Sequence, residues 1–293
     1  MTLSSTDGTS TPFASVPAAV PTAAGARPLE GKRIVIVGGT TGLGLSAATA
    51  CLKAGARLVL VGRDEESCDE AKEAFGAPTV VLCGDATLAE TSEAAVTAAI
   101  EAHGGLDGLY HVAGGSGRRH GDGPLHELTN DGWDRTLALN LNSVMYSNRA
   151  AVRQFLSQRS AGSILNMGSV LGFAPSPKFF STHAYAAAKA AIEGFSMSIA
   201  SYYAPKNIRV NVLAPALVQT PMSRRAMTDE RIQSFVASKQ PLDGGRVGVP
   251  SDLDAAALFF LGDGSRFCTG QVLAVDGGWC LSDGQWQTGE EGA

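Results

Sequence analysis

Short apolar runs alternate with longer segments of helical spacing along most of this 293-residue chain. The runs are largely continuous rather than alternately polar, which is typical of strands covered on both faces. Segments such as Gly44–Ala54 and Ala184–Tyr203 between them have the spacing of helices. The alternation predicts an α/β fold, a doubly wound parallel sheet of about seven strands with helices on both faces. The expected strands are Ile34–Val37, Leu58–Val61, Val80–Leu82, Leu109–Val112, Ser163–Met167, Arg209–Leu213 and Val272–Val275.

These strands account for the body of the chain, so residues 30–284 are expected to form one domain. Residues 1–29 are rich in Ser, Thr, Ala and Pro and contain one basic residue, Arg27, so we expect a flexible N-terminal tail. An N-terminal segment that caps a partner subunit is the alternative. Residues 285–293 are expected to form a C-terminal tail.

Charge and cysteine content exclude several classes of protein. The net charge is −5 and no block of Lys and Arg stands out, so no nucleic-acid partner is expected. No apolar run approaches the roughly 20 residues that span a bilayer. The cysteines are scattered without a C-x-x-C pair, which argues against a disulfide framework or a metal site and favours a cytoplasmic location. They are Cys51, Cys68, Cys83, Cys268 and Cys280.

A glycine-rich loop follows the first expected strand and opens directly into a helix. Glycine lets the backbone turn tightly and approach a pyrophosphate, whose charge is favourable at a helix N-terminus. A tight turn without a ligand is the alternative, but the place of the loop in the alternation favours dinucleotide binding. The expected contacts are Gly38, Thr40, Thr41, Gly42, Leu43 and Gly44.

The second expected strand ends in Val61-Gly62-Arg63-Asp64, where the adenosine ribose should bind. An acid at position 62 would select NAD, whereas Gly62 leaves space and Arg63 can pair with a 2′-phosphate. We therefore expect NADP(H) in preference to NAD(H). Alternatively, Arg63 stacks on the adenine and Asp64 holds an unphosphorylated ribose.

Tyr185 and Lys189 are spaced by four residues and share one face of an expected helix. A tyrosine with a pKa of ~10 needs about 4 kcal/mol of phenolate stabilisation to act near neutral pH. A lysine ammonium about 4 Å away can supply a term of that size. The pair therefore predicts a proton-transferring tyrosine, with Lys189 also able to hold the nicotinamide ribose.

Two further polar residues belong with this pair. Ser169 follows an expected strand at its carboxyl end, where its hydroxyl can hydrogen-bond a substrate oxygen. Asn140 lies on the helix after the fourth strand and can anchor a water that connects Lys189 to solvent. Each of these residues alone is better explained by a structural role. All four together, in this order along an α/β chain, are better explained by catalysis.

The chain resembles the short-chain dehydrogenase/reductase family from about Leu29 to Asp283. The spacing of Gly38, Gly42 and Gly44 fits the family's G-x-x-x-G-x-G loop, and Asn140, Ser169, Tyr185 and Lys189 match its catalytic tetrad. The resemblance implies a Rossmann-type sheet and a homotetramer or homodimer in which the helix of Tyr185 packs against its mate. It also implies further cofactor contacts from Asp85, Ala86, Ala113, Gly114, Tyr185, Lys189, Pro215, Val218 and Thr220.

The sequence departs from the family pattern at several positions. Val37 replaces the usual threonine, and Ala216 replaces a glycine. His111 replaces an asparagine whose amide normally braces the central strands. Ser169 and Tyr185 are 16 positions apart, about three more than is usual, which predicts a reshaped substrate pocket.

The resemblance places the substrate between the segment before Tyr185 and the segment after Thr220. The glycine-rich loop Gly115–Gly123 is a further candidate for the lining. Apolar lining is general for such sites. The arginines suggest an anionic substrate, although solvated loop charges are the better-supported explanation. The candidate lining residues are Pro175, Pro177, Phe179, Phe180, His183, Met222, Met227, Arg224, Arg225, Arg118, Arg119 and His120.

The sequence therefore predicts an NAD(P)(H)-dependent oxidoreductase that interconverts a secondary alcohol and a ketone, with Tyr185 as general acid/base. Its expected partner is a small carbonyl or alcohol substrate. The alternative is a dinucleotide-binding redox sensor or scaffold without turnover, for which an intact tetrad would be unnecessary. A methyltransferase would leave Tyr185 and Lys189 unexplained.

Overall fold

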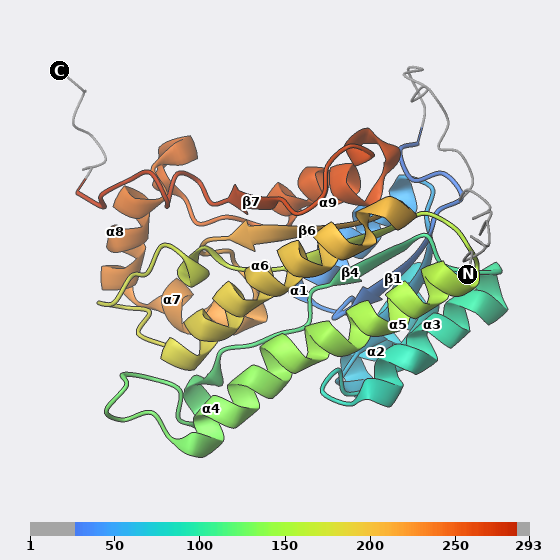
Figure 1. Ribbon diagram of the computed structural model, residues 1–293. Coiled ribbons are helices and arrows are strands. Elements are labelled where there is room, and N and C mark those ends of the chain that lie inside the picture. Colours follow the sequence, from blue (N-terminus) through green and yellow to red (C-terminus); the bar gives the residue numbers. More distant parts are fainter. Residues whose placement is uncertain (1–26, 286–293) are drawn as a thin grey trace, which may run out of the picture.

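A parallel sheet of seven strands forms the centre of the molecule (Figure 1). The computed structural model describes residues 27–285, so most of the two predicted tails, 1–29 and 285–293, lies outside the described residues. The strands are β1 (Arg33–Val37), β2 (Arg57–Gly62), β3 (Val80–Cys83), β4 (Gly108–His111), β5 (Gly162–Met167), β6 (Ile208–Pro215) and β7 (Val272–Val275). Each of the seven predicted strands is confirmed, with ends shifted by no more than two residues.

The strand order is β3-β2-β1-β4-β5-β6-β7, and all neighbours are parallel. The chain moves outward from β1 to β3 and then returns to place β4 on the other side of β1. Val37 is therefore paired with Val61 on one side and with His111 on the other. The chain runs from β1 toward one edge of the sheet and from β4 toward the other. In sheets of this kind, such a reversal leaves a crevice beyond the carboxyl ends of the two strands.

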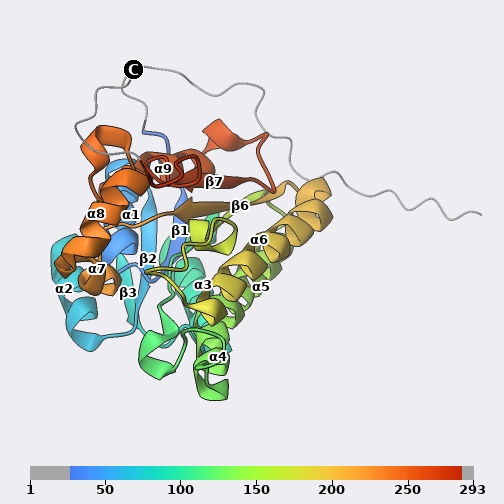
Figure 2. The ribbon, with the colours of Figure 1, turned by 90° about the vertical axis from the view of Figure 1, so that its left-hand side faces the viewer.

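Helices cover both faces of the sheet, as the sequence predicted (Figure 2). They are α1 (Gly42–Lys53), α2 (Glu65–Phe75), α3 (Ala89–His103), α4 (Asn130–Leu137), α5 (Ser143–Ser157), α6 (His183–Tyr203), α7 (Arg224–Thr228), α8 (Glu230–Lys239) and α9 (Asp254–Leu261). None of the helices within residues 27–285 has the length and apolar character needed to cross a membrane.

Alternate residues of the strands feed two separate cores. Ile34 and Ile36 pack with α1 and α9, whereas Val35 and Val37 pack with α3 and α5 on the opposite face. Both faces of β1 are thus fully buried. This double burial explains why the runs are continuously apolar rather than alternating.

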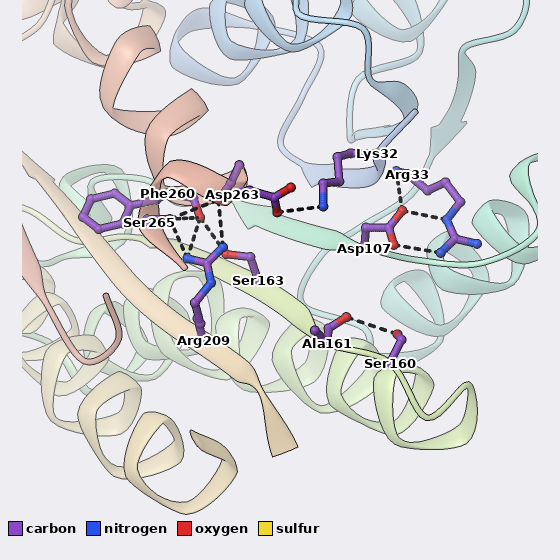
Figure 3. Close-up of polar contacts among 11 residues, drawn as sticks. Lys32, Arg33, Asp107, Ser160, Ala161, Ser163, Arg209, Phe260, Asp263 and Ser265 are labelled. Atoms are coloured by element: carbon purple, nitrogen blue, oxygen red, sulfur yellow. Dashed lines mark hydrogen bonds and ion pairs between the residues drawn. The ribbon is translucent and has the colours of Figure 1, made fainter. Parts of the chain in front are cut away.

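The amino-terminal edge of the sheet is closed by polar contacts (Figure 3). Arg33 of β1 forms a two-pronged ion pair with Asp107, with N···O distances of 2.7 and 2.8 Å. Arg209 of β6 donates to the carbonyl of Phe260 at 3.0 Å and to Gly262 at 3.1 Å, at the C-terminal end of α9. Lys32 pairs with Asp263 at 2.9 Å. These contacts hold the strand starts in register.

Candidate active site

The two edges of the sheet are the places to consider for a site. A cavity of about 530 Å³ lies at the amino-terminal edge, lined by Lys32, Asp107 and Arg209 among others. Its principal charges are paired with one another or with helix carbonyls, and parallel sheets bind ligands at the opposite edge. The carboxyl-terminal edge, which faces the viewer in Figure 2, is therefore the candidate active site.

The glycine-rich loop after β1 is shaped by contacts that a side chain would prevent. A Cβ at Gly38 would lie 2.6 Å from the backbone nitrogen of Ala113, and one at Gly44 would lie 1.9 Å from the carbonyl oxygen of Gly38. Gly38 also has φ +84° and Gly42 has φ +52°, which favour glycine. The loop thus folds back on itself and against the loop after β4.

The loop leads into α1 with its first amides open to a ligand. Thr41 is the N-cap residue, in extended conformation, and its side chain makes no capping hydrogen bond. Leu43 packs against the core, and Thr220 approaches a Cβ position at Gly42 within 3.5 Å. The glycines leave space that a Cβ would fill, and the backbone N–H groups at the start of α1 have no side-chain cap. Both features fit the pyrophosphate of a dinucleotide.

The end of β2 is more tightly packed than its sequence suggested. A Cβ at Gly62 would lie 2.3 Å from Oγ1 of Thr40 and 2.7 Å from Sγ of Cys68. Glycine is therefore required there by packing, and the space expected beside it is already filled by Thr40, whose hydroxyl also hydrogen-bonds Ser67 at 3.2 Å. Arg63 remains exposed beside this cluster.

The neighbouring acids have structural roles. The carboxylate of Asp64 caps α2 by accepting from the backbone N–H of Ser67 at 3.1 Å. Asp85, after β3, accepts from the backbone and the hydroxyl of Thr87, both at 2.8 Å. Ala86 beside it is buried. The cap occupies Asp64, which weakens the alternative in which Asp64 holds an unphosphorylated ribose.

Ser169, Tyr185 and Lys189 are brought together at the carboxyl ends of β5 and β6. Ser169 starts the 3-10 turn Val170–Gly172 and accepts from the backbone N–H of Leu171 at 3.2 Å. The Ser169 side chain lowers the pKa of the Tyr185 phenol against the effect of burial. Nζ of Lys189 lies 5.5 Å from the centre of the Tyr185 ring and donates to the carbonyl of Met167 at 2.8 Å. The longer gap before Tyr185 therefore does not separate these groups.

The electrostatics of this cluster differ from the sequence expectation. Burial raises the pKa of the Tyr185 phenol above its usual value, and the hydrogen bond with Ser169 opposes the rise. Burial lowers the pKa of Lys189 to about 7. Lys189 faces the ring rather than the hydroxyl and is bonded to a backbone carbonyl, so the protein alone does not reproduce the expected lowering of the Tyr185 pKa.

Asn140 lies in a π-helical turn, Ala138–Asn142, between α4 and α5. Its fully buried amide donates to the carbonyls of Gly115 and Thr136, both at 2.9 Å, and accepts from the N–H of Gly115 at 3.1 Å. A Cβ at Gly114 would lie 2.8 Å from Oδ1 of Asn140 and 3.5 Å from Nζ of Lys189. Asn140 and Lys189 thus meet at Gly114.

His111, which stands where the family has an asparagine, is fully buried and bonded through both ring nitrogens. Its buried ring contacts Ser147 Oγ at 2.7 Å, Ser143 Oγ at 3.2 Å and the carbonyl of Ala113 at 3.2 Å. Burial and the nearby Lys189 lower the pKa of His111 to about 3, so the ring is neutral. The two polar atoms of the imidazole thus connect β4 to α5, and none of its hydrogen bonds within the described residues reaches a neighbouring strand.

Asp122 was not singled out from the sequence. Its buried carboxylate accepts from the backbone N–H of Ala184 with one oxygen and from that of Tyr185 with the other, both at 3.0 Å. The loop that carries it is packed against α4, where a Cβ at Gly117 would lie 1.7 Å from Oγ1 of Thr136. The loop after β4 therefore fixes the start of the helix that carries Tyr185.

The segment after β6 forms another wall. Pro215 ends β6, and Val218 is buried and forms a bridge with Gly248. Thr220 exchanges hydrogen bonds with Ser223 at the start of a helical turn. Gln240, also absent from the sequence-based site, braces Leu217 through Oε1 and Nε2 at 2.9 and 3.2 Å.

An aromatic cluster closes the region before α6. The Phe179 and Phe235 ring centres are 5.2 Å apart, and Trp279 lies 5.7 Å from Phe180 and 5.8 Å from Phe235. Arg118 and Arg225 both donate to the carbonyl of Phe179, at 3.1 and 2.9 Å. The three segments expected to line a substrate site are thus connected to one another.

Comparisons with known proteins agree with this arrangement. The family model described as Enoyl-(Acyl carrier protein) reductase matches residues 37–280. The chain is 34% identical over 257 residues to 2-(S)-hydroxypropyl-CoM dehydrogenase 3 of Xanthobacter autotrophicus, covering 85% of this chain and 97% of the relative. It is 35% identical over 235 residues to inactive 2-(S)-hydroxypropyl-CoM dehydrogenase 2 of the same organism, covering 79% and 98%.

A solved structure gives the same result. The crystal structure of levodione reductase superposes with a TM-score of 0.79 at 26% identity, covering 86% of this chain and 98% of that one.

Proposed function

Because the chain belongs to the short-chain dehydrogenase/reductase family, we propose that it interconverts a secondary alcohol and a ketone with NADP(H), and that Tyr185 transfers the proton. That it is an oxidoreductase acting on alcohols or ketones follows from the family and from relatives such as 2-(S)-hydroxypropyl-CoM dehydrogenase 3. The cofactor preference and the role of Tyr185 are the further steps of the proposal.

The observation that carries the mechanism is the position of Lys189, whose Nζ lies 5.5 Å from the centre of the Tyr185 ring and donates to Met167, two residues before Ser169 at the end of β5. A ketone oxygen placed between the two hydroxyls accepts a hydrogen bond from Ser169 and a proton from Tyr185. The nicotinamide, when bound, supplies the hydride for reduction or accepts it in oxidation. A protonated tyrosine is the form needed to reduce a ketone, and the raised pKa of Tyr185 favours that form.

Lys189 and Asn140 have supporting roles in the proposal. The ammonium of Lys189, already near the Tyr185 ring, stabilises the phenolate that remains after proton transfer. With its pKa lowered to about 7, Lys189 can exchange a proton near neutral pH. Asn140 holds the loop at Gly114 and Gly115 next to Lys189, where it can anchor a water that exchanges protons with Lys189.

NADP(H) is preferred in this proposal because of Arg63. The guanidinium is exposed at the end of β2 and forms no ion pair within residues 27–285, so it is available to a 2′-phosphate. Asp64 caps α2 and is less available to hold a ribose. The pyrophosphate would lie on the amides at the start of α1, beside Gly38, Gly42 and Gly44.

The test is a titration followed by a turnover screen. NADPH and NADH are titrated separately and the nicotinamide fluorescence is followed. Ketones, secondary alcohols and a crotonyl thioester are then screened with the tighter-binding cofactor. We expect tighter NADPH binding and turnover of ketones. Turnover of the thioester alone would indicate an enoyl reductase, which the description of the matching family model also suggests.

A second candidate is a dinucleotide-binding protein without turnover. The relative that is named inactive supports this candidate, because it is 35% identical to this chain. The relative without that word in its name is 34% identical, so identity alone does not separate the two cases. Tight NADPH binding with no turnover across the screen would favour this second function.

We also propose a homotetramer or homodimer in which α6 packs against its mate. Met197 and Tyr202 on α6 are 48% and 76% exposed, so both are available to such an interface. Light scattering coupled to size-exclusion chromatography tests the assembly, and a Tyr202→Glu substitution is expected to weaken it.

A further inference from the structure

We propose that the substrate carries an anionic group, a carboxylate, sulfonate or phosphate, that binds the guanidinium groups of Arg118 and Arg225. This inference rests on the proposed function and names its substrate class. The two arginines come from different segments, one from the loop after β4 and one from α7 (Figure 2).

The two guanidinium groups are held close together by a neutral acceptor. Nη2 of Arg118 and Nη2 of Arg225 lie 3.1 and 2.9 Å from the same carbonyl oxygen of Phe179. Two like charges this close repel, and a carbonyl carries no charge to offset them. The repulsion and burial together lower the pKa of Arg118. An anion between them would remove this repulsion.

Other contacts keep the two side chains in this position. The guanidinium of Arg225 lies 6.0 Å from the centre of the Phe180 ring, and that ring packs edge-on against Trp279. Both arginines are exposed, so a ligand can reach their guanidinium groups. Each guanidinium makes one hydrogen bond within the described part of the chain, so most of its N–H groups remain for a ligand.

Acidic side chains around the pair are few. The segments 115–123, 172–182 and 220–228 contain Arg118, Arg119, Lys178, Arg224 and Arg225 but a single acid, Asp122. Asp122 attracts Arg118, but both of its oxygens are bonded to the amides of Ala184 and Tyr185. The local charge is thus positive in a chain whose net charge is −5.

The position of the pair relates it to the reacting group. Phe179 lies six residues before Tyr185, and Arg118 lies four residues before Asp122, which binds the Tyr185 N–H. A substrate whose anion binds the two arginines therefore places the rest of its chain next to the start of α6. Arginine is suited to this role because its planar fork binds carboxylate and phosphate oxygens in pairs.

The test compares matched substrates that differ only in charge. Acetoacetate, levulinate and longer methyl ketones with a terminal carboxylate are each assayed beside their methyl esters, with NADPH and NADH. We expect one chain length to give a kcat/KM at least about tenfold above that of its ester, since a charge-assisted hydrogen bond contributes that much. The preference should shrink as salt is added.

Variants then assign the preference to the two residues. Arg118→Gln and Arg225→Gln are expected to raise KM for the preferred acid by about tenfold or more and to leave its ester within about twofold. Arg231→Gln is the matched control, since Arg231 pairs with Asp229 on the exposed surface of α8. Cofactor affinity and circular dichroism report whether each variant is folded.

The outcomes separate this inference from the proposed function. Equal kcat/KM for every acid and its ester, or variants that lower both equally, would overturn the anionic substrate while leaving the ketone reductase intact. Loss of NADPH affinity in the two variants would assign the arginines to the cofactor phosphates and would also overturn it. Failure to reduce any acid or ester contradicts the proposed function itself.

Discussion

The backbone N–H of Tyr185 donates a 3.0 Å hydrogen bond to Oδ2 of Asp122, which lies 63 residues earlier in the chain. The other oxygen, Oδ1, accepts from the N–H of Ala184. A buried carboxylate at a helix N-terminus also interacts favourably with the helix dipole. Asp122 therefore ties the loop after β4 to the first turn of α6.

We predict that Asp122→Asn lowers kcat by about tenfold or more, because Tyr185 loses its fixed position. An asparagine can accept a hydrogen bond from only one of the two backbone N–H groups, because its own NH₂ group would face the other. The dissociation constant of the cofactor should stay within about twofold, since the glycine loop is untouched. Steady-state kinetics and cofactor titration measure both quantities.

Asp229→Asn is the control for this prediction. Asp229 caps α8 by accepting from the backbone N–H of Arg231, so the variant makes the same Asp-to-Asn change at a helix cap away from Tyr185. Asparagine caps helices about as well as aspartate, so the free energy of unfolding should change by less than about 1 kcal/mol and kcat should not change. If both variants lowered kcat by the same factor, Asp122 would have no specific role in positioning Tyr185.

Arg63 is predicted to distinguish the two cofactors. Arg63→Ala should weaken NADPH binding by about ten- to a hundredfold, the value of a charge-assisted hydrogen bond, and should change NADH binding little. Arg57→Ala, at the other exposed end of β2, is the control and should affect neither. Equal weakening of both cofactors would instead favour adenine stacking by Arg63.

Much of this architecture follows from local sequence. The strands were predictable because burial of both faces leaves continuous apolar runs, as for Ile34 and Val35 on opposite faces of β1. The glycine loop was predictable because Gly38 and Gly44 meet specific steric limits that no other residue satisfies. Tyr185 and Lys189 were predictable because a helix places residues four apart on one face.

Other features depend on partners that are distant in sequence. Nothing near Asp122 indicates that it caps a helix 62 residues later. The packing at Gly62 depends on Thr40 and Cys68, which come from two other elements. The position of Lys189 depends on the carbonyl of Met167, and a side-chain spacing cannot reveal a backbone acceptor.

His111 is predicted to make stability depend on pH. Its pKa is lowered to about 3 in the folded protein, below the ~6.5 of an unfolded histidine. Between these values the unfolded chain binds one more proton, so stability falls as pH decreases, by up to about 1.4 kcal/mol per pH unit. The contribution is fully present above pH ~6.5.

His111→Asn should remove close to one proton from the difference in bound protons between the unfolded and folded states. The substitution keeps a polar side chain against α5. Urea unfolding between pH ~4.5 and ~7 measures the slope. The control is His126→Asn, because His126 is 80% exposed and should not change the slope. Equal slopes for the wild type and His111→Asn would mean that His111 is protonated in the folded state.

The central claim is that Tyr185 transfers the proton in an alcohol–ketone reaction, and Tyr185→Phe tests it most directly. The measurement is turnover of the best ketone found in the screen, together with NADPH affinity, for the wild type and the variant. We predict that kcat falls by about a thousandfold or more while NADPH affinity stays within about twofold. A variant that retains most of its turnover would contradict the account.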